Sequence, residues 1–99
     1  MQQILDQLEQ LAREMTFLPE DDRVLFYQRV NPVMLGLKGE LRRSPNAFAE
    51  KKVEELEWHL TVIAHLDDPD GQTDQEHLAE ALSLLDQLRS PRGFGAGSE

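Results

Sequence analysis

Cysteine is absent from this chain of 99 residues, and aromatic residues make up only 6% of it. Without a thiol the chain has no disulfide, no thiolate nucleophile and no cysteine-ligated zinc site. The sequence also lacks any run near the roughly 18 apolar residues of a membrane span, and its start lacks the basic and apolar blocks of a signal peptide. We therefore expect a cytoplasmic protein that does not bind or cross a membrane.

Basic residues are scarce as well. Ten Lys and Arg stand against 19 Asp and Glu, which gives a formal net charge of −9. Because such a surface repels phosphate backbones, nucleic acid is not an expected partner. The imbalance lies in one half: residues 44–99 carry twelve acids and four bases, whereas residues 1–43 carry seven acids and six bases. With 39% hydrophobic residues the chain still has the composition of a folded domain.

The hydrophobic spacing predicts helices and no set of strands. An amphipathic helix should run from near the start to about Met15, and a second should begin at Pro19 and Glu20. The run 24–27 (VLFY) is apolar all round, which we interpret as buried helix. Asn31–Pro32 is a typical cap and first-turn pair, so residues 24–30 and 32–43 form either one kinked helix or two.

The second half predicts two more helices. Ser44–Pro45 starts a long helix to about Leu66, and the sequence from Thr73 to Glu76 fits a capping box for the last one. We therefore expect an all-α, compact bundle of four or five helices in which residues 45–66 and 74–89 form an antiparallel hairpin. Residues 1–90 would be a single helical domain, and residues 91–99 a Gly-rich tail that is flexible unless Phe94 docks.

The helix predicted for residues 45–66 is apolar on two nearly opposite sides. Ala49, Val53, Leu56, Leu60 and Ile63 form one side, and Trp58, Val62 and Leu66 form the other. Either the helix is central and buried on both sides, or the Trp58 side is an interface with a second copy or another protein. His65 lies near that side, and Arg42 and Arg43 would supply a polar rim.

The other candidate sites have the wrong spacing for metal chemistry. None of His59, His65 and His77 follows a Glu by three residues, so we expect surface or rim histidines without a metal. The acidic loop 67–76 puts the wrong residues at the ligand positions of a calcium loop, so we expect a solvated turn. Gly36 and Gly39 mark either a helix end or a close helix crossing.

No catalytic residue set, cofactor site or metal site follows from these patterns. We therefore expect a non-enzymatic protein interaction module, such as an adaptor, assembly factor or regulator, acting alone or as a homodimer. Its interface residues would be Trp58, Val62, Leu66, His65, Arg42 and Arg43. The alternative is an acidic decoy that blocks a basic nucleic-acid-binding protein. The acids of that surface would be Glu50, Glu54, Glu57, Asp67, Asp68 and Asp70.

Overall fold

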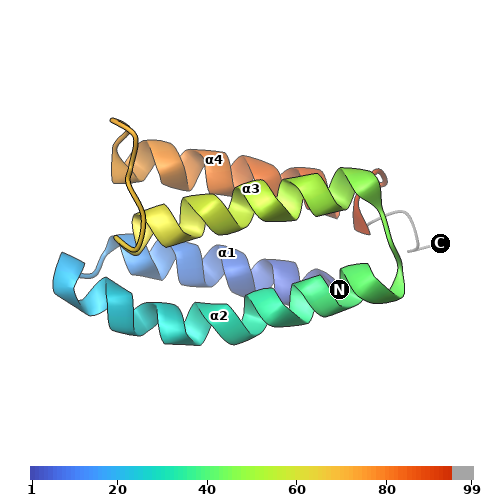
Figure 1. Cartoon of the computed structure of the whole chain (residues 1–99), viewed down its shortest axis with the longest axis horizontal. Helices are drawn as coiled ribbons and strands as arrows, with labels where there is room; N and C mark the ends of the chain where they lie inside the picture. The colour runs from blue at the N-terminus through green and yellow to red at the C-terminus, as the bar shows by residue number, and fades with distance from the viewer. Residues whose placement is uncertain (95–99) are drawn as a thin grey trace.

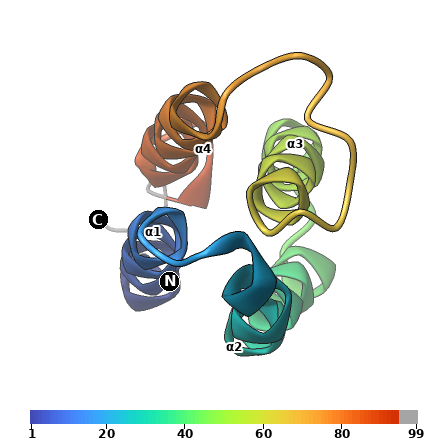
Figure 2. The ribbon, with the colours of Figure 1, turned by 90° about the vertical axis from the view of Figure 1, so that its left-hand side faces the viewer.

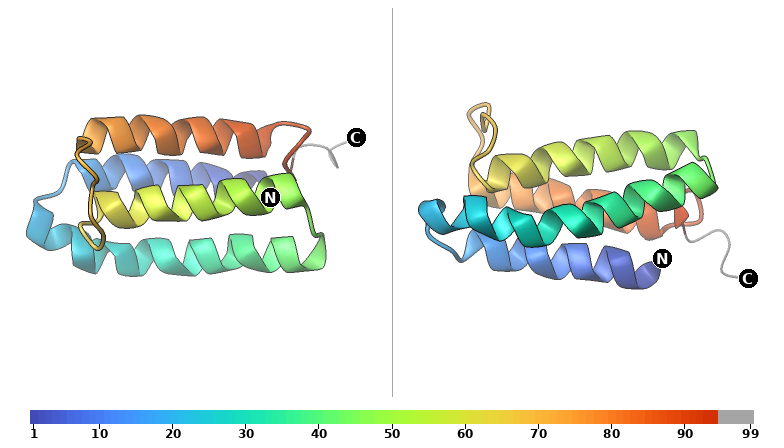
Figure 3. Two further views of the ribbon diagram at one scale, coloured as in Figure 1. Left: turned by 45° about the horizontal axis from the view of Figure 1, so that its top comes forward. Right: turned by 60° about the horizontal axis from the view of Figure 1, so that its bottom comes forward.

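The computed structural model describes residues 1–94, which contain four helices: α1 (Gln2–Thr16), α2 (Glu20–Arg43), α3 (Ala47–Ile63) and α4 (Asp74–Arg89). Consecutive helices run in opposite directions along the long axis (Figures 1 and 3). Viewed from one end, they occupy the four corners of a bundle (Figure 2). The described residues contain no strand, so the predicted all-α helical bundle is confirmed. No described helix is long and apolar enough to cross a membrane.

One apolar stripe from each helix forms the core. In α1 the stripe follows the spacing expected for a helix that is covered on one side, with Leu5, Leu8, Ala12 and Met15 buried. The other three helices contribute Val30, Met34, Leu37, Leu56, Leu60, Ile63, Leu78, Leu85 and Leu88. Burying a side chain of this size stabilises the fold by roughly 1.5–3 kcal/mol. The core is therefore the main source of stability, and α3 packs most extensively on α4.

Residues 20–43 form one continuous helix. Pro32 lies inside α2 on its exposed side, and neither Gly36 nor Gly39 ends the helix. Proline cannot donate a backbone hydrogen bond to the carbonyl of Gln28. The helix continues because Val30, Met34 and Leu37 on its other side are fully buried. Core packing therefore decides between the one-helix and two-helix alternatives in favour of one.

The ends of α3 differ from the prediction. Asn46, not Ser44, caps the helix: its side-chain oxygen accepts a hydrogen bond from the Ala49 backbone N–H at 3.1 Å. At the other end His65 adopts a left-handed backbone with φ 64°, and the Leu66 N–H donates to the carbonyl of Thr61 at 2.9 Å. This arrangement is a Schellman motif, which ends α3 at Ile63 and not near Leu66.

Specific contacts hold the start of α4 and the segment that follows the end of this helix. The predicted capping box is confirmed, since Thr73 and Glu76 bond to each other's backbone N–H groups. After α4, the Asn46 amide donates to the carbonyl of Arg92 at 3.0 Å, and Phe94 packs against the core. Phe94 therefore docks, which the sequence left open. The rest of the predicted tail, residues 95–99, lies outside the described residues.

Candidate interaction face

The predicted strip of Trp58, Val62 and Leu66 is not one exposed surface. Trp58 is 37% exposed and Leu66 49%, but Val62 between them is only 1% exposed, so its place in the strip was wrong. The reason is that most of the last turn of α3 is covered: Leu60, Ile63 and Ala64 are also buried, and Thr61 is partly exposed. Two partly exposed apolar side chains remain, separated by a buried one.

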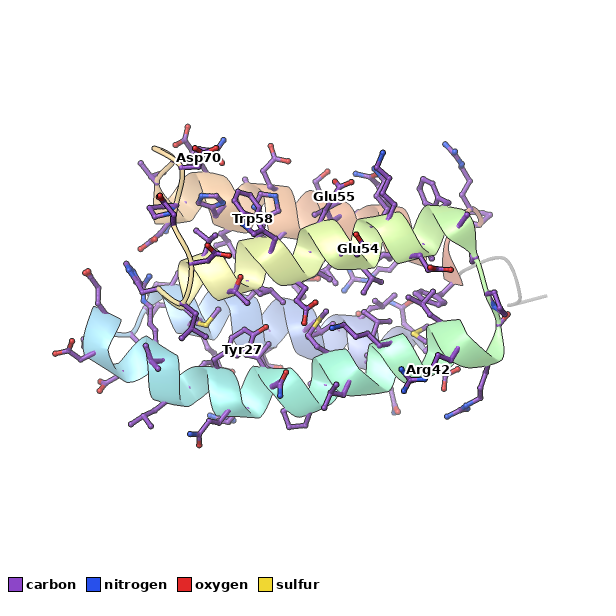
Figure 4. All side chains as sticks on the ribbon, viewed as in Figure 1. Tyr27, Arg42, Glu54, Glu55, Trp58 and Asp70 are labelled. Atoms are coloured by element: carbon purple, nitrogen blue, oxygen red, sulfur yellow. The ribbon has the colours of Figure 1, made fainter. Side chains whose placement is uncertain are left out.

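The two arginines predicted as a rim lie elsewhere. Arg42 and Arg43 belong to the last turn of α2, and Figure 4 places Arg42 well away from Trp58 along the bundle. Arg43 forms an ion pair with Glu40 at 2.9 Å. They therefore cannot surround the indole. His65 is exposed as expected, but its ring nitrogen lies 3.3 Å from the Arg23 guanidinium, which ties it to the end of the bundle.

Two histidines beneath Trp58 form a buried pair, and their placement on the surface or rim was wrong. His77 is fully buried and His59 is 9% exposed. Their Nδ1 atoms are 2.9 Å apart, and His77 Nε2 lies 2.8 Å from the carbonyl of Pro69. Since that carbonyl can only accept, Nε2 of His77 carries a proton, and when both rings are neutral its Nδ1 accepts from the Nδ1–H of His59.

The surroundings of His59 oppose its protonation. Burial lowers the pKa of His59, and the neighbouring His77 lowers it further, whereas Glu80 and Glu55 act in the opposite direction. The Trp58 ring meets both imidazoles edge-on, with centroid distances of 4.8 Å to His59 and 5.4 Å to His77. Much of the Trp58 indole therefore packs against side chains of its own chain. Among the described residues no group of three or more His, Asp or Glu side chains could hold a metal ion.

Arg23 joins the ends of all four helices. It is 6% exposed and donates hydrogen bonds to the backbone carbonyls of Thr16, Leu18 and Ile63. It also pairs with Asp74 at 2.6 Å. A buried guanidinium requires this number of acceptors to offset its loss of hydration. Sequence reasoning missed this role, because nothing in the local sequence separates Arg23 from an ordinary exposed arginine.

Three exposed apolar side chains lie on the outer side of α2, while Phe17, 88% exposed, follows the end of α1. Leu25 is 64% exposed, Leu35 55% and Val24 44%. Gln28, Asn31 and Pro32 lie between them and are also exposed. At 100° per residue these six positions fall within a sector of about 120°. In the right-hand view of Figure 3, α2 lies in front with no other described helix over this side.

This side of α2 is uncharged in its middle and charged at its ends. Residues 24–37 contain a single charged residue, Arg29. Its guanidinium turns aside to lie 5.0 Å from the centre of the Phe26 ring. Asp21, in the first turn, and Arg42, in the last, fall in the same sector as Leu25 and Leu35. Neither forms an ion pair with any described residue.

We call this surface the α2 outer face. Its members are Asp21, Val24, Leu25, Gln28, Asn31, Pro32, Leu35, Gly39, Arg42 and Arg43. It is about 30 Å long at 1.5 Å per residue. The sequence did contain a signal for it: one charge in fourteen residues is too few for a helix that is covered on only one side. The interpretation of Val24 and Leu25 as buried is therefore wrong.

A groove of about 370 Å³ separates the C-terminal half of α2 from the start of α3. Leu41, Pro45 and Val53 supply its apolar lining, with Lys38 and Arg42 on one wall and Glu50 and Glu54 on the other. Figure 4 shows Arg42 and Glu54 on these two helices. Lys38, one of the lining residues, forms an ion pair with Glu57 at 2.8 Å.

Tyr27 lies further along the contact between α2 and α3 (Figure 4). Its hydroxyl is buried and has no hydrogen-bond partner among the described residues. Burial, and secondarily the carboxylate of Glu57, raises the pKa of Tyr27 to about 12. The hydroxyl therefore stays protonated at neutral pH and does not act as a base there.

Comparison of the chain with known protein families, curated proteins and solved structures finds no match.

Proposed function

We propose that this protein is a non-enzymatic interaction module that binds a protein partner through the α2 outer face. The observation that carries the proposal is the exposure of Leu25, Leu35 and Val24 on one uncharged side of a helix. Several exposed apolar side chains on one uncharged side of a helix are typical of protein–protein contact surfaces. In this proposal α1 and the C-terminal hairpin of α3 and α4 are the scaffold that holds α2 in place.

The proposal predicts binding that depends on apolar contact. Leu35→Glu places a charge at the centre of the face and should remove proteins captured from lysate of the native host. Ala79→Glu adds the same charge at an exposed position of α4 and is the matched control. Binding by apolar contact should persist in about 0.5 M salt, where the Debye length is only a few ångströms. Equal capture by wild type and Leu35→Glu would contradict the proposal.

The acidic decoy remains a second candidate function, and the charge distribution supports it. Glu50, Glu54, Asp67, Asp68 and Asp70 are exposed, and none of them forms an ion pair with a described residue. Glu57, which was expected to join them, is engaged by Lys38. Binding of this kind should be lost in high salt and on Glu50→Gln with Glu54→Gln, but should be unaffected by Leu35→Glu.

A further inference from the structure

We infer that the partner of the α2 outer face is a second copy of this chain, paired antiparallel about a two-fold axis near Asn31 and Pro32. This inference rests on the proposed function, because it assigns the occupant of the same face. The argument for a second copy comes from charge complementarity along α2. The helix begins with Glu20, Asp21 and Asp22 and ends with Arg42 and Arg43.

An antiparallel pair brings opposite charges together at both ends. With the axis between Asn31 and Pro32, Asp21 of one copy lies opposite Arg42 of the other, and the same pair recurs at the far end. Two parallel copies would instead set acid against acid and base against base. In the antiparallel arrangement the two helix dipoles also point in opposite directions, which is electrostatically favourable.

The uncharged middle of the face suits the same pairing. Gln28 of one copy lies opposite Leu35 of the other, and Val24 lies opposite Gly39. A side chain added at Gly39 would meet only the end of Arg42, 4.0 Å away, so no contact within the monomer explains this glycine. Opposite a second helix, the missing side chain allows the close approach that a shallow crossing of about 20° requires.

The overall charge of the chain is compatible with this contact. Most of the net −9 belongs to residues 44–99, whereas the half that contains α2 has nearly equal numbers of acids and bases. Two copies that meet through α2 therefore bring their less acidic halves together. Because each copy contributes a single helix, the interface is small, and we expect a dissociation constant of roughly 1–100 µM.

Sedimentation equilibrium of the full chain tests the inference directly. Wild type should convert from monomer to dimer over the micromolar range. Leu35→Glu should weaken the dimer at least tenfold, and Ala79→Glu should leave it unchanged. Wild type that remains monomeric up to about 1 mM would overturn the inference.

Charge reversal tests the antiparallel orientation. Asp21→Arg alone and Arg42→Asp alone should each weaken self-association about tenfold, because each creates two like-charge contacts per dimer. An equimolar mixture of the two variants should regain association, since every reversed residue then faces an opposite charge. Both positions are exposed, and circular dichroism would confirm that each variant keeps its helices. A mixture no tighter than the separate variants would overturn the antiparallel pairing.

The two proposals fail in different ways. If wild type stays monomeric but Leu35→Glu still abolishes capture of other proteins, the α2 outer face binds a different partner and only the second-copy inference is wrong. If Leu35→Glu changes neither self-association nor capture, the face has no binding role and both proposals are wrong.

Discussion

Hydrogen bonds hold three of the four ring nitrogens of the His59–His77 pair. Because His77 Nε2–H is committed to the carbonyl of Pro69, a single proton lies between the two Nδ1 atoms. A second proton between the two Nδ1 atoms would place two N–H donors opposite each other, with no acceptor. The hydrogen bond to Pro69 also connects this pair to the loop between α3 and α4, so the protonation state of the pair bears on how that loop is held.

Acid should therefore destabilise the fold through His59. Burial holds the pKa of His59 below its ordinary value of 6.5, so the unfolded chain binds the proton more readily than the folded chain. The contribution of this group to stability is complete above pH 6.5 and decreases as pH falls from there toward the folded pKa. Urea unfolding at pH 7.5 and 5.5 should show a lower free energy of unfolding at pH 5.5.

Glutamine variants separate this effect from other titrations. The double variant His59→Gln with His77→Gln should lose most of the difference between the two pH values, whereas His65→Gln, at an exposed position, should retain it. Glu9 does not contribute in this window, because hydrogen bonds from Arg13 and Arg89 lower its pKa further below 4.5. An unchanged pH dependence in the double variant would contradict the assignment to the imidazole pair.

At the scale of elements, the sequence predicted the residues at which helices begin better than it predicted which side of each helix is covered by its neighbours. The capping box at Thr73 is a local signal and was predicted correctly. The apolar stripe of α1 likewise follows from the residues of that helix alone. Ser44–Pro45 gave the same kind of signal, but Asn46 supplies the cap two residues later. The outward side of α2 depends on which helices surround it, which no local pattern specifies.

Proline within α2 leads to a prediction about this helix. Pro32 is exposed and costs the helix the hydrogen bond to the Gln28 carbonyl, so Pro32→Ala should raise the free energy of unfolding by about 1–3 kcal/mol. The midpoint of urea unfolding at low protein concentration measures this gain. Pro45→Ala, between α2 and α3, is the control and should give no gain. A less stable Pro32→Ala protein would show that the packing of α2 requires the proline.

At the scale of the whole molecule, hydrophobic spacing predicted the all-helical class and the charge counts located the acidic second half, whereas the proposed binding surface was recognised only in the structure. The buried and exposed sides of α2 are both apolar, so hydrophobicity alone does not separate core from interface. The separation comes from the other three helices, which cover Val30, Met34 and Leu37 and leave Leu25 and Leu35 open. The proposed self-association rests on the charges at the two ends of that open side.

Substitutions at two glycines of α2 should separate the stability of the monomer from the strength of the proposed dimer. Gly39→Ala should stabilise the monomer by about 1 kcal/mol, since alanine favours a helix interior and the added carbon has room. The same change should weaken self-association, because it separates the two α2 helices where Gly39 faces Val24 of the second copy. Urea unfolding at low concentration and sedimentation equilibrium measure these two quantities independently.

Gly36→Ala is the matched control for that pair of measurements. A side chain at Gly36 would point toward α1, with Ile4 Cδ1 3.8 Å away, so it lies beside the α2 outer face and not on it. It should give a similar gain in monomer stability with no loss of association. If Gly39→Ala and Gly36→Ala left the dimer equally strong, then Gly39 would not lie in the contact, and the axis near Asn31 and Pro32 would be wrong.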